Sequence, residues 1–429
     1  MTQGLTTSPK NYSGTCIRCG SCMSVCPIYQ VSLQETDVAR GKMELLEWER
    51  SHPEFKESDI FNKIISRCLL CGACENSCPN KVPTKDCIQE VRQHLSQNTK
   101  EKIMLSSLKS LMKSKTSGTI FRKSGSFFQH LVGKKLPDSS GMHLRFPLRS
   151  MSNRKFIPEI SSRSFANMYS SEYSEPKEQT KRIVYFTGCG ANYLFIETAR
   201  ALMNVFEKYN IVPFVPQEQV CCGLPFYASG DQTNAIALAK KNIDVIDHLQ
   251  PDVVLTTCAS CGSHIHQWID LLKNEPDYHI RAQKIAKQQK DAMIFLMEEN
   301  SSEKIFSQIS DNSEKIKANI WYHHPCHLRF GKTQSPLPKK WFDAFPHVNI
   351  IYSDDKCCGN GGKFQLSHFD LSMKIFDKRM DDFSPKDIHH VLTSCTGCQL
   401  QFSEGMLRHG MTAKVAHPLT WLANINLLS

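Results

Sequence analysis

Two copies of one twelve-residue pattern decide the fold of the N-terminal region: CIRCGSCMSVCP at residues 16–27 and CLLCGACENSCP at residues 68–79. In each copy, three closely spaced thiols can bind three irons of a cubane [4Fe-4S] cluster, and the fourth cysteine, before proline, binds the other cluster in two-cluster ferredoxins. Gly20 and Gly72 let the backbone approach the inorganic sulfides. The sequence therefore predicts two cubane clusters with these ligand sets: Cys16, Cys19, Cys22 with Cys78, and Cys68, Cys71, Cys74 with Cys26.

Zinc is the alternative metal for closely spaced cysteines. A tetrahedral zinc site usually takes its ligands from two CxxC pairs. Each copy here supplies a third closely spaced thiol that a zinc knuckle does not need, so the pattern favours iron-sulfur clusters. The surrounding sequence has no strand-like run, and residues 41–50 and 58–65 are helical in pattern. We expect residues 1–98 to form a mostly α-helical dicluster domain of the ferredoxin type.

The C-terminal half contains an internal repeat. Five cysteines recur at offsets of 136 or 137 residues, which chance does not produce. An apolar stripe with helical spacing recurs at the offset of 137, from Ile236, Ala239, Ile243 and Ile246 to Met373, Phe376, Met380 and Phe383. The two sets of cysteines are Cys189, Cys221, Cys222, Cys258, Cys261 and Cys326, Cys357, Cys358, Cys395, Cys398.

Each copy alternates short apolar runs with helical segments. The runs 183–186 and 253–255 in the first copy correspond to 320–322 and 391–392 in the second. Such alternation predicts βα units around a small parallel sheet, with the cysteines gathered at the carboxyl ends of the strands. We expect two α/β lobes, residues 181–300 and 316–429, each with a Cys-Cys-Gly turn.

Three chemistries compete for the five thiols of each lobe: a further iron-sulfur cluster, zinc, or a redox-active thiol pair without metal. Adjacent cysteines such as Cys221 and Cys222 can hardly both bind one small tetrahedral ion without strain, which favours a multi-iron centre. Neighbouring histidines could add a ligand or donate a proton, but a solvated or supporting role is more common. These histidines are His264, His266, His323, His324 and His327.

The net charge of +10 on 429 residues is local. Residues 100–164 hold 14 basic and three acidic side chains, whereas the rest of the chain is close to neutral. We expect residues 99–180 to be a basic linker with short amphipathic helices, suited to an anionic membrane surface. A solvated linker or a docking segment for an acidic partner is the equal alternative. Nucleic-acid binding is disfavoured because no recognisable fold for it is present.

The sequence also excludes several classes of protein. It shows no secretory signal and no apolar run of the length that spans a bilayer, so the cysteines belong to a reducing, cytoplasmic setting. Gly188-Cys-Gly190 follows a predicted strand, but Tyr193 stands where a dinucleotide fingerprint needs glycine. We therefore expect no FAD or NAD on this chain, and catalytic residues cannot be assigned from the sequence.

The whole pattern resembles the iron-sulfur subunits of glycolate oxidase, D-lactate dehydrogenase and anaerobic glycerol-3-phosphate dehydrogenase. It is also similar to the D subunit of heterodisulfide reductase. CPIYQ at 26–30 and RGK at 40–42 are similar to the glycolate oxidase type, and RKFIP at 154–158 to the glycerol-3-phosphate type. Both CxxC pairs, 258–261 and 395–398, are complete, as in the heterodisulfide reductase pattern.

The resemblance implies an electron-transfer subunit that takes electrons from an FAD-containing dehydrogenase partner oxidising a 2-hydroxy acid such as glycolate or lactate. Electrons would pass toward quinone or another membrane-bound acceptor, with the chain peripheral at the inner face of the cell membrane. In this family the Cys-Cys-Gly lobes hold a non-cubane [4Fe-4S] cluster or, in some lobes, zinc. The alternatives are a glycerol-3-phosphate dehydrogenase subunit and a catalytic heterodisulfide or thiol reductase that uses a lobe-bound cluster.

Overall fold

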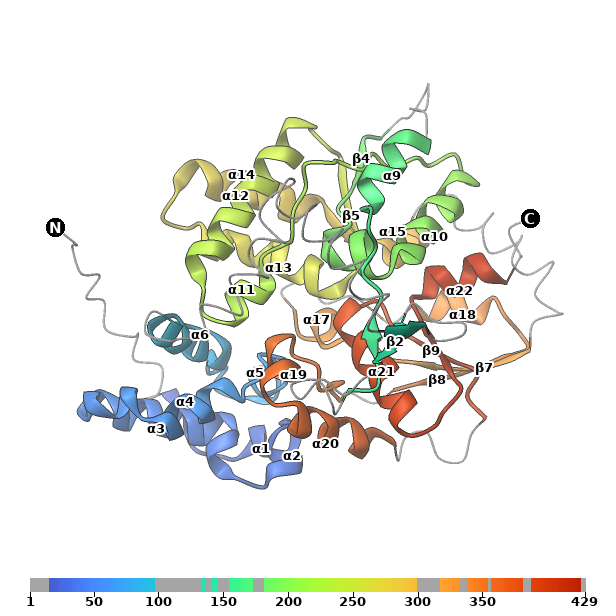
Figure 1. Ribbon diagram of the computed structural model, residues 1–429. Coiled ribbons are helices and arrows are strands. Elements are labelled where there is room, and N and C mark those ends of the chain that lie inside the picture. Colours follow the sequence, from blue (N-terminus) through green and yellow to red (C-terminus); the bar gives the residue numbers. More distant parts are fainter. Residues whose placement is uncertain are drawn as a thin grey trace. The chain divides into compact units, whose positions relative to one another are not determined.

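The computed structural model describes residues 15–96, 133–135, 141–144, 154–172, 181–298, 317–331, 336, 338–353, 356–380 and 387–425. The chain forms two compact units (Figure 1). Unit 1 consists of Met1–Lys100, Pro225–Gln232 and Lys356–Arg379, and unit 2 of Glu101–Leu224, Thr233–Asp355 and Met380–Ser429. The segments after both Cys-Cys-Gly turns thus belong to the same unit as the N-terminal motifs.

Helices are the only regular elements among the described residues of unit 1. The predicted helices are confirmed as α3 (Ala39–Ser51) and α4 (Asp59–Ser66). Phe61 and Ile65 of α4 and Ile88 of α6 are fully buried in its main apolar cluster. The other helices are α1 (Ser21–Val25), α2 (Tyr29–Ser32), α5 (Ala73–Ser77), α6 (Thr84–Ser96), α11 (Leu224–Ala228), α19 (Lys363–Ser367), α20 (Phe369–Met380), and the 3-10 turns η2 (Glu35–Asp37) and η3 (Pro53–Glu57).

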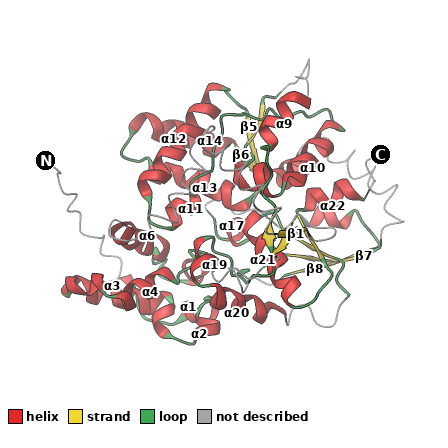
Figure 2. Ribbon diagram, viewed as in Figure 1, coloured by secondary structure: helices red, strands yellow, loops and turns green. Residues whose placement is uncertain are grey.

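Unit 2 contains two parallel sheets, as the repeat predicted (Figure 2). The first has the order β4-β5-β6 and the second β10-β9-β7-β8. A single bridge from Val184 to Phe214 stands in the first sheet where β8 stands in the second, so the two sheets share one topology. The strands are β4 (Ile183–Tyr185), β5 (Val253–Thr256), β6 (Gln289–Asp291), β7 (Ala318–Tyr322), β8 (Val348–Tyr352), β9 (His390–Leu392) and β10 (Lys414–Ala416).

The two lobes share one apolar core. Tyr185, Leu255 and Phe295 of the first lobe and Trp341 and Trp421 of the second belong to a single cluster of buried side chains. Burial of apolar surface contributes about 25 cal/mol per Å², so the lobes stabilise one another. The helices of unit 2 are α9 (Phe165–Glu172), the π-helix η4 (Gly190–Leu194), α10 (Ile196–Glu207), α12 (Gln232–His248), α13 (Ala259–Leu271), α14 (Pro276–Gln288), α15 (Ala292–Glu298), α17 (Cys326–Arg329), α18 (Lys339–Asp343), α21 (Thr396–Arg408) and α22 (Pro418–Asn424).

The recurring apolar stripe is buried only in part. Ala239, Ile243 and Ile246 are fully buried on α12, but Ile236 is half-buried because Ala235 and Leu238 carry the buried face there. In the second copy Met373 and Phe376 are buried on α20, Met380 is half-buried, and Phe383 lies outside the described residues.

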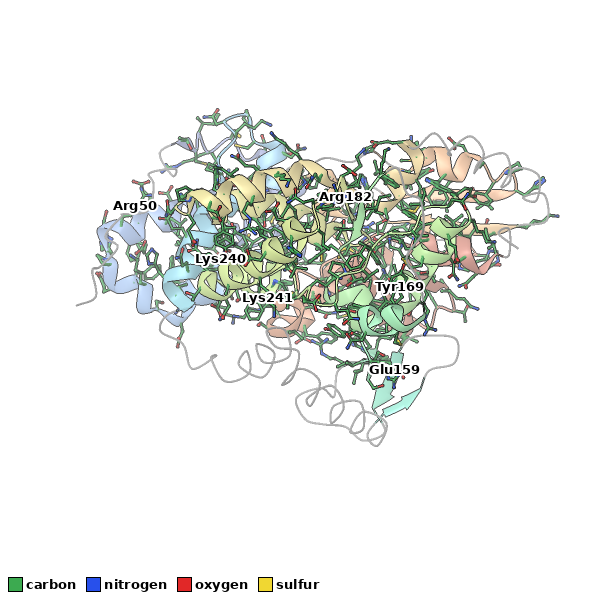
Figure 3. All side chains as sticks on the ribbon, turned by 90° about the horizontal axis from the view of Figure 1, so that it is seen from above. Arg50, Glu159, Tyr169, Arg182, Lys240 and Lys241 are labelled. Atoms are coloured by element: carbon green, nitrogen blue, oxygen red, sulfur yellow. The ribbon has the colours of Figure 1, made fainter. Side chains whose placement is uncertain are left out.

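The outer face of α12 is polar. Figure 3 labels Lys240 and Lys241 on this helix. Lys240 forms an ion pair with Glu275, and its ammonium lies 5.0 Å from the centre of the Tyr278 ring. The polar face of this helix is thereby tied to the start of α14.

The described parts of the linker form a small antiparallel sheet, β1 (Gly133–Lys135), β2 (Gly141–Leu144) and β3 (Ile157–Pro158). These strands were not predicted, because two to four residues are too few to show an alternating apolar pattern. The predicted amphipathic helices over residues 103–131 lie outside the described residues. Among the helices that are described, none has the length and apolar character needed to cross a membrane.

Candidate functional site

The two N-terminal motifs adopt the same backbone conformation. Gly20 and Gly72 have φ of 82° and 83°, in the left-handed region that favours glycine. Two residues earlier, Arg18 and Leu70 also have positive φ, at 56° and 52°. These turns wrap each CxxCxxC loop into a cup, after which α1 or α5 begins.

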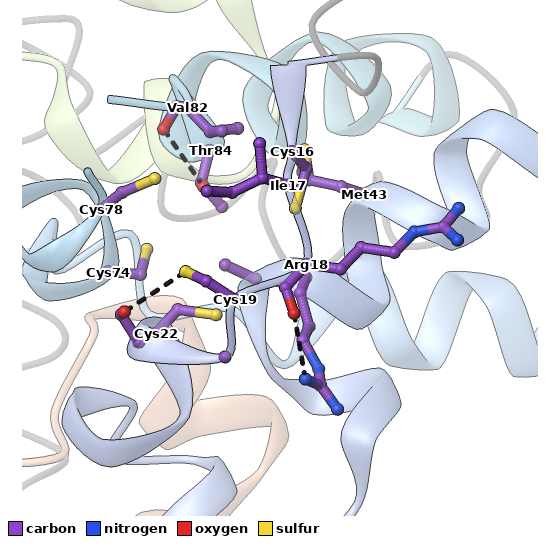
Figure 4. Close-up of a pocket in the computed structure, with 14 residues that line it drawn as sticks. Cys16, Ile17, Arg18, Cys19, Cys22, Met43, Cys74, Cys78, Val82 and Thr84 are labelled. Atoms are coloured by element: carbon purple, nitrogen blue, oxygen red, sulfur yellow. Dashed lines mark hydrogen bonds between the residues drawn. The ribbon is translucent and has the colours of Figure 1, made fainter. Parts of the chain in front are cut away.

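The first cup opens onto a cavity that brings together one predicted ligand set. Cys16, Cys19, Cys22 and Cys78 all line this cavity, together with Cys74 (Figure 4). Cys19 is exposed, and its Sγ lies 3.3 Å from Ser21 Oγ. This hydrogen bond lowers the pKa of the Cys19 thiol.

A second cavity brings together the other predicted set. Cys26, Cys68, Cys71 and Cys74 line it. Burial raises the pKa of Cys71 and of Cys74, and the charge of Cys357 raises that of Cys71 further. Cys71 and Cys357 both belong to unit 1, so the second cavity lies beside the Cys-Cys-Gly turn of the second repeat.

Both cavities suit a [4Fe-4S] cluster. The first is lined by five cysteines and the second by four, and the backbone N–H of Leu70 points at Cys68 Sγ over 3.5 Å. Buried thiols whose pKa is raised bind as thiolates only when a metal supplies positive charge. Cys74 lines both cavities and lies between the two candidate centres.

The first repeat gathers all five of its cysteines in unit 2. The thiol of Cys221 interacts with Cys189 and with Cys222, and these contacts raise the pKa of Cys221. Contacts with Cys221 and Cys261 lower the pKa of Cys222. Contacts with Cys261 and with Cys395 of the second repeat lower the pKa of Cys258. Such a buried cluster of sulfurs fits a multi-iron centre, because metal charge would relieve the repulsion among its thiolates.

Buried polar side chains that were not predicted from the sequence hold the Cys221-Cys222 turn. Asn242 Nδ2 donates to the carbonyl oxygen of Cys221 over 3.0 Å, and Trp268 Nε1 donates to that of Cys222 over 3.0 Å. Asn242 is fully buried on the apolar face of α12, and the buried Arg379 occupies the same place in the second repeat. The sequence does carry a signal for this role, because a polar residue, Asn242 or Arg379, interrupts the apolar helix face at the equivalent position of both repeats.

The cysteines of the second repeat are divided between the units. Cys326, Cys395 and Cys398 belong to unit 2, whereas Cys357 and Cys358 belong to unit 1. In unit 2, Ser260 Oγ of the first repeat lies 3.2 Å from Cys395 Sγ. In unit 1, the backbone N–H of Gly359 donates to Cys357 Sγ over 3.4 Å.

Inside unit 2, candidate histidines lie close to candidate cysteines. His327 Nδ1 lies 3.0 Å from Ser260 Oγ and 4.0 Å from Cys326 Sγ. Burial lowers the pKa of His264, while the charge of Cys222 acts in the opposite direction. His323 Nδ1 lies 3.4 Å from Ser353 Oγ, and a ring nitrogen of His323 lies within 4.8 Å of Cys398 Sγ. His266 bonds Gln289 over 3.1 Å. His324 is buried near the start of α17.

Comparison with known proteins agrees with this architecture. Residues 13–82 match a 4Fe-4S dicluster domain, and residues 183–266 and 320–403 each match the cysteine-rich CCG domain. The crystal structure of a hypothetical protein from Helicobacter pylori has a similar fold, with a TM-score of 0.52, 8% identity, and coverage of 95% of this chain and 71% of that one.

Curated relatives span nearly the whole chain. The probable glycolate oxidase iron-sulfur subunit of Bacillus subtilis (strain 168) is 27% identical over 93% of this chain and 90% of its own length. The glycolate oxidase iron-sulfur subunit of Escherichia coli (strain K12) is 24% identical over 90% and 88%. The D subunit of a heterodisulfide reductase from Methanosarcina acetivorans is 24% identical over 91% and 88%. The chain therefore belongs with the iron-sulfur oxidoreductase subunits that join a 4Fe-4S dicluster domain to two cysteine-rich CCG domains.

Proposed function

We propose that this chain is the electron-transfer subunit of a flavin-dependent 2-hydroxy-acid dehydrogenase. Its two cavities, lined by Cys16, Cys19, Cys22 and Cys78 and by Cys26, Cys68, Cys71 and Cys74, hold two cubane clusters. The observation that carries the proposal is this pair of cavities within one compact unit. Such centres carry single electrons, so the two-electron oxidation of the substrate takes place on an FAD-containing partner.

The arrangement of the two centres suggests the direction of electron transfer. Cys19 is exposed, so the first cluster is the one that a partner's flavin can approach. The second cavity interacts through Cys71 with Cys357, so electrons leave it toward the CCG domains. From there they pass to quinone or another acceptor, and the basic linker attaches the chain to the inner face of the membrane.

The test is purification from the native host with its partners, followed by metal and flavin counts. We expect a flavoprotein to copurify, and glycolate or lactate to bleach the cluster absorbance only when that flavoprotein is present. Iron in excess of the roughly eight atoms of two cubanes supports a further cluster in the CCG domains, whereas stoichiometric zinc supports the metal alternative. Flotation with anionic liposomes, with and without residues 100–150, tests the membrane attachment.

A catalytic thiol or disulfide reductase is the second candidate. The crowding of five thiols in the first repeat, four of them buried, favours it, because a cluster bound there could meet a disulfide substrate directly. If the isolated, reconstituted chain reduces disulfides with a chemical electron donor and without a flavoprotein, this second candidate replaces the first.

A further inference from the structure

The two cavities of unit 1 differ in the charges around them. At the first cavity, each lining cation is paired with an accessible carboxylate. Arg18 Nη2 lies 2.6 Å from Glu44 Oε2, and Arg40 Nε lies 2.7 Å from Glu35 Oε1. All four side chains reach solvent, with Arg40 the least exposed at 27%. The charges at this cavity are balanced, and water screens them.

At the second cavity, one lining cation is buried. The Lys42 side chain is 1% exposed, and its ammonium donates to the carbonyl oxygens of Thr36 over 3.1 Å and Asp37 over 2.5 Å. The Asp37 carboxylate lies 3.9 Å from Lys42 Nζ, but it is bound more closely by Arg67 Nη1 at 3.0 Å. Burial lowers the pKa of Lys42, and the charges of Cys68, Asp37 and Cys26, which all line this cavity, act in the opposite direction.

Arg92 of α6 brings a further cation to the same ligands. Its guanidinium donates to the carbonyl oxygens of Ile65 over 2.9 Å, Ser66 over 3.1 Å and Cys68 over 2.6 Å, and its charge interacts with Cys68. The other lining cation, Lys85, is paired with Glu75 at 3.0 Å. Asp37 pairs with both Lys42 and Arg67, and Arg92 adds a third cation at Cys68, so cations outnumber carboxylates around the second cavity.

Net charge near a cluster shifts its reduction potential. One-electron reduction adds one negative charge to the centre and forms or breaks no bond, so a nearby cation stabilises the reduced form. Burial by itself disfavours that added charge, but it also leaves the cations unscreened. At the first cavity both effects are weaker and the paired charges cancel.

We infer that Lys42, together with Arg92, raises the reduction potential of the cluster in the second cavity above that of the cluster in the first. Lys42 touches no substrate, and its charge acts only on the reduction potential of the cluster. The inference rests on the proposed function only in its source of electrons, the partner's reduced flavin. An electron that enters at Cys19 then moves inward to the cavity beside Cys357, and does not return to the surface.

The test is a potentiometric titration of the full-length chain, reconstituted anaerobically and followed by EPR. Cys19→Ser first identifies which signal belongs to the first cavity. In Lys42→Gln we expect the other signal to become at least tenfold harder to reduce, which is a shift of about 59 mV or more for one electron. Lys63→Gln, which removes an exposed cation of α4 outside the linings of both cavities, is the control and should leave both potentials within that margin.

If Lys42→Gln does not retain iron, the pair Arg92→Gln and Arg92→Lys takes its place. We then expect the glutamine variant to lower the potential of the second centre and the lysine variant to restore it. The inference is overturned if neutralising the charge shifts neither potential, shifts both equally, or if the second centre has the lower potential in the unchanged protein. No partner or substrate enters the titration, so its failure is distinguishable from failure of the proposed function.

Discussion

The backbone N–H of Ala259 donates a hydrogen bond to the carbonyl oxygen of Ser394 over 2.8 Å, and this bond joins the two repeats beside their equivalent cysteines. Cys258 and Cys395 hold the same place in the two copies and contact one another there. The surroundings are not symmetric. Thr396 of the second repeat packs against Gly190 of the first, and the equivalent positions hold Ala259 and His327.

The Gly190–Thr396 pair predicts a specific packing defect. A Cβ at Gly190 would overlap the Thr396 side chain, so Gly190→Ala should lower the free energy of unfolding by about 1–3 kcal/mol, as overpacked cores do. Thr396→Ala removes the obstructing atoms, and the double variant should recover more than half of the loss. Denaturant unfolding of the four proteins measures this coupling, and strictly additive effects would contradict it.

The cysteine sets and the repeat could be predicted because ligand spacing and strand-to-ligand order are local properties of the sequence. The role of Lys42 and Arg92 could not be predicted, because it depends on which cavity these side chains reach in the folded chain. The carbonyl oxygens that they bind are positioned by the fold of η2 and α4. Ser260 meets Cys395 across 135 residues, a pairing that no spacing reveals. The assignment of Cys357 to unit 1 likewise depends on packing after the Cys-Cys-Gly turn.

The side chain of Glu404 holds the end of the linker within unit 2. This buried carboxylate accepts backbone N–H bonds from Lys155 at 3.0 Å and from Phe156 at 2.7 Å. Glu404→Ala leaves these donors without an acceptor, at a cost of about 1–3 kcal/mol. We expect a lower unfolding midpoint together with faster hydrogen exchange at the two amides.

Glu404→Gln serves as the matched control for that prediction. Its amide oxygen still accepts one of the two N–H bonds, so the loss should be smaller than with alanine. Unchanged exchange at Lys155 and Phe156 in the alanine variant would show that other contacts hold this segment.

Asp291 predicts a pH dependence of stability. Burial raises the pKa of this carboxyl to about 7, although Met293 N donates to it over 3.0 Å. An unfolded aspartate titrates near 3.9, so between roughly pH 4 and 7 the folded chain holds a proton that the unfolded chain has lost. The free energy of unfolding should therefore fall by up to about 1.4 kcal/mol per pH unit as pH rises through this range, and level off above it.

Asp291→Asn should remove this slope, because the amide is neutral at every pH and still accepts the bond from Met293. Urea unfolding at pH 5.5, 6.5, 7.5 and 8.5 checks the prediction. The free energy of unfolding of the variant should rise relative to that of the unchanged protein as pH rises. Asp252→Asn is the control, since Asp252 also accepts a backbone bond, from Arg182 N over 2.8 Å, but lies exposed. If the free energy of unfolding varied with pH in the same way for Asp291→Asn and the unchanged protein, the pH dependence could not be assigned to Asp291.

We expect substitutions of Cys87 and of Cys74 to differ in their effect on metal content. Cys87 packs with Met43, Leu46 and Phe61, and burial raises the pKa of its thiol to about 12, so it behaves as a small apolar side chain. Cys74 lies between the two cavities. Cys87→Ala should keep the full iron content with a modest packing loss, whereas Cys74→Ala should lose iron and the EPR signal of at least one cubane. Iron analysis after anaerobic reconstitution compares the two, and equal iron loss in both variants would mean that Cys87 supports a cluster through the core it packs into.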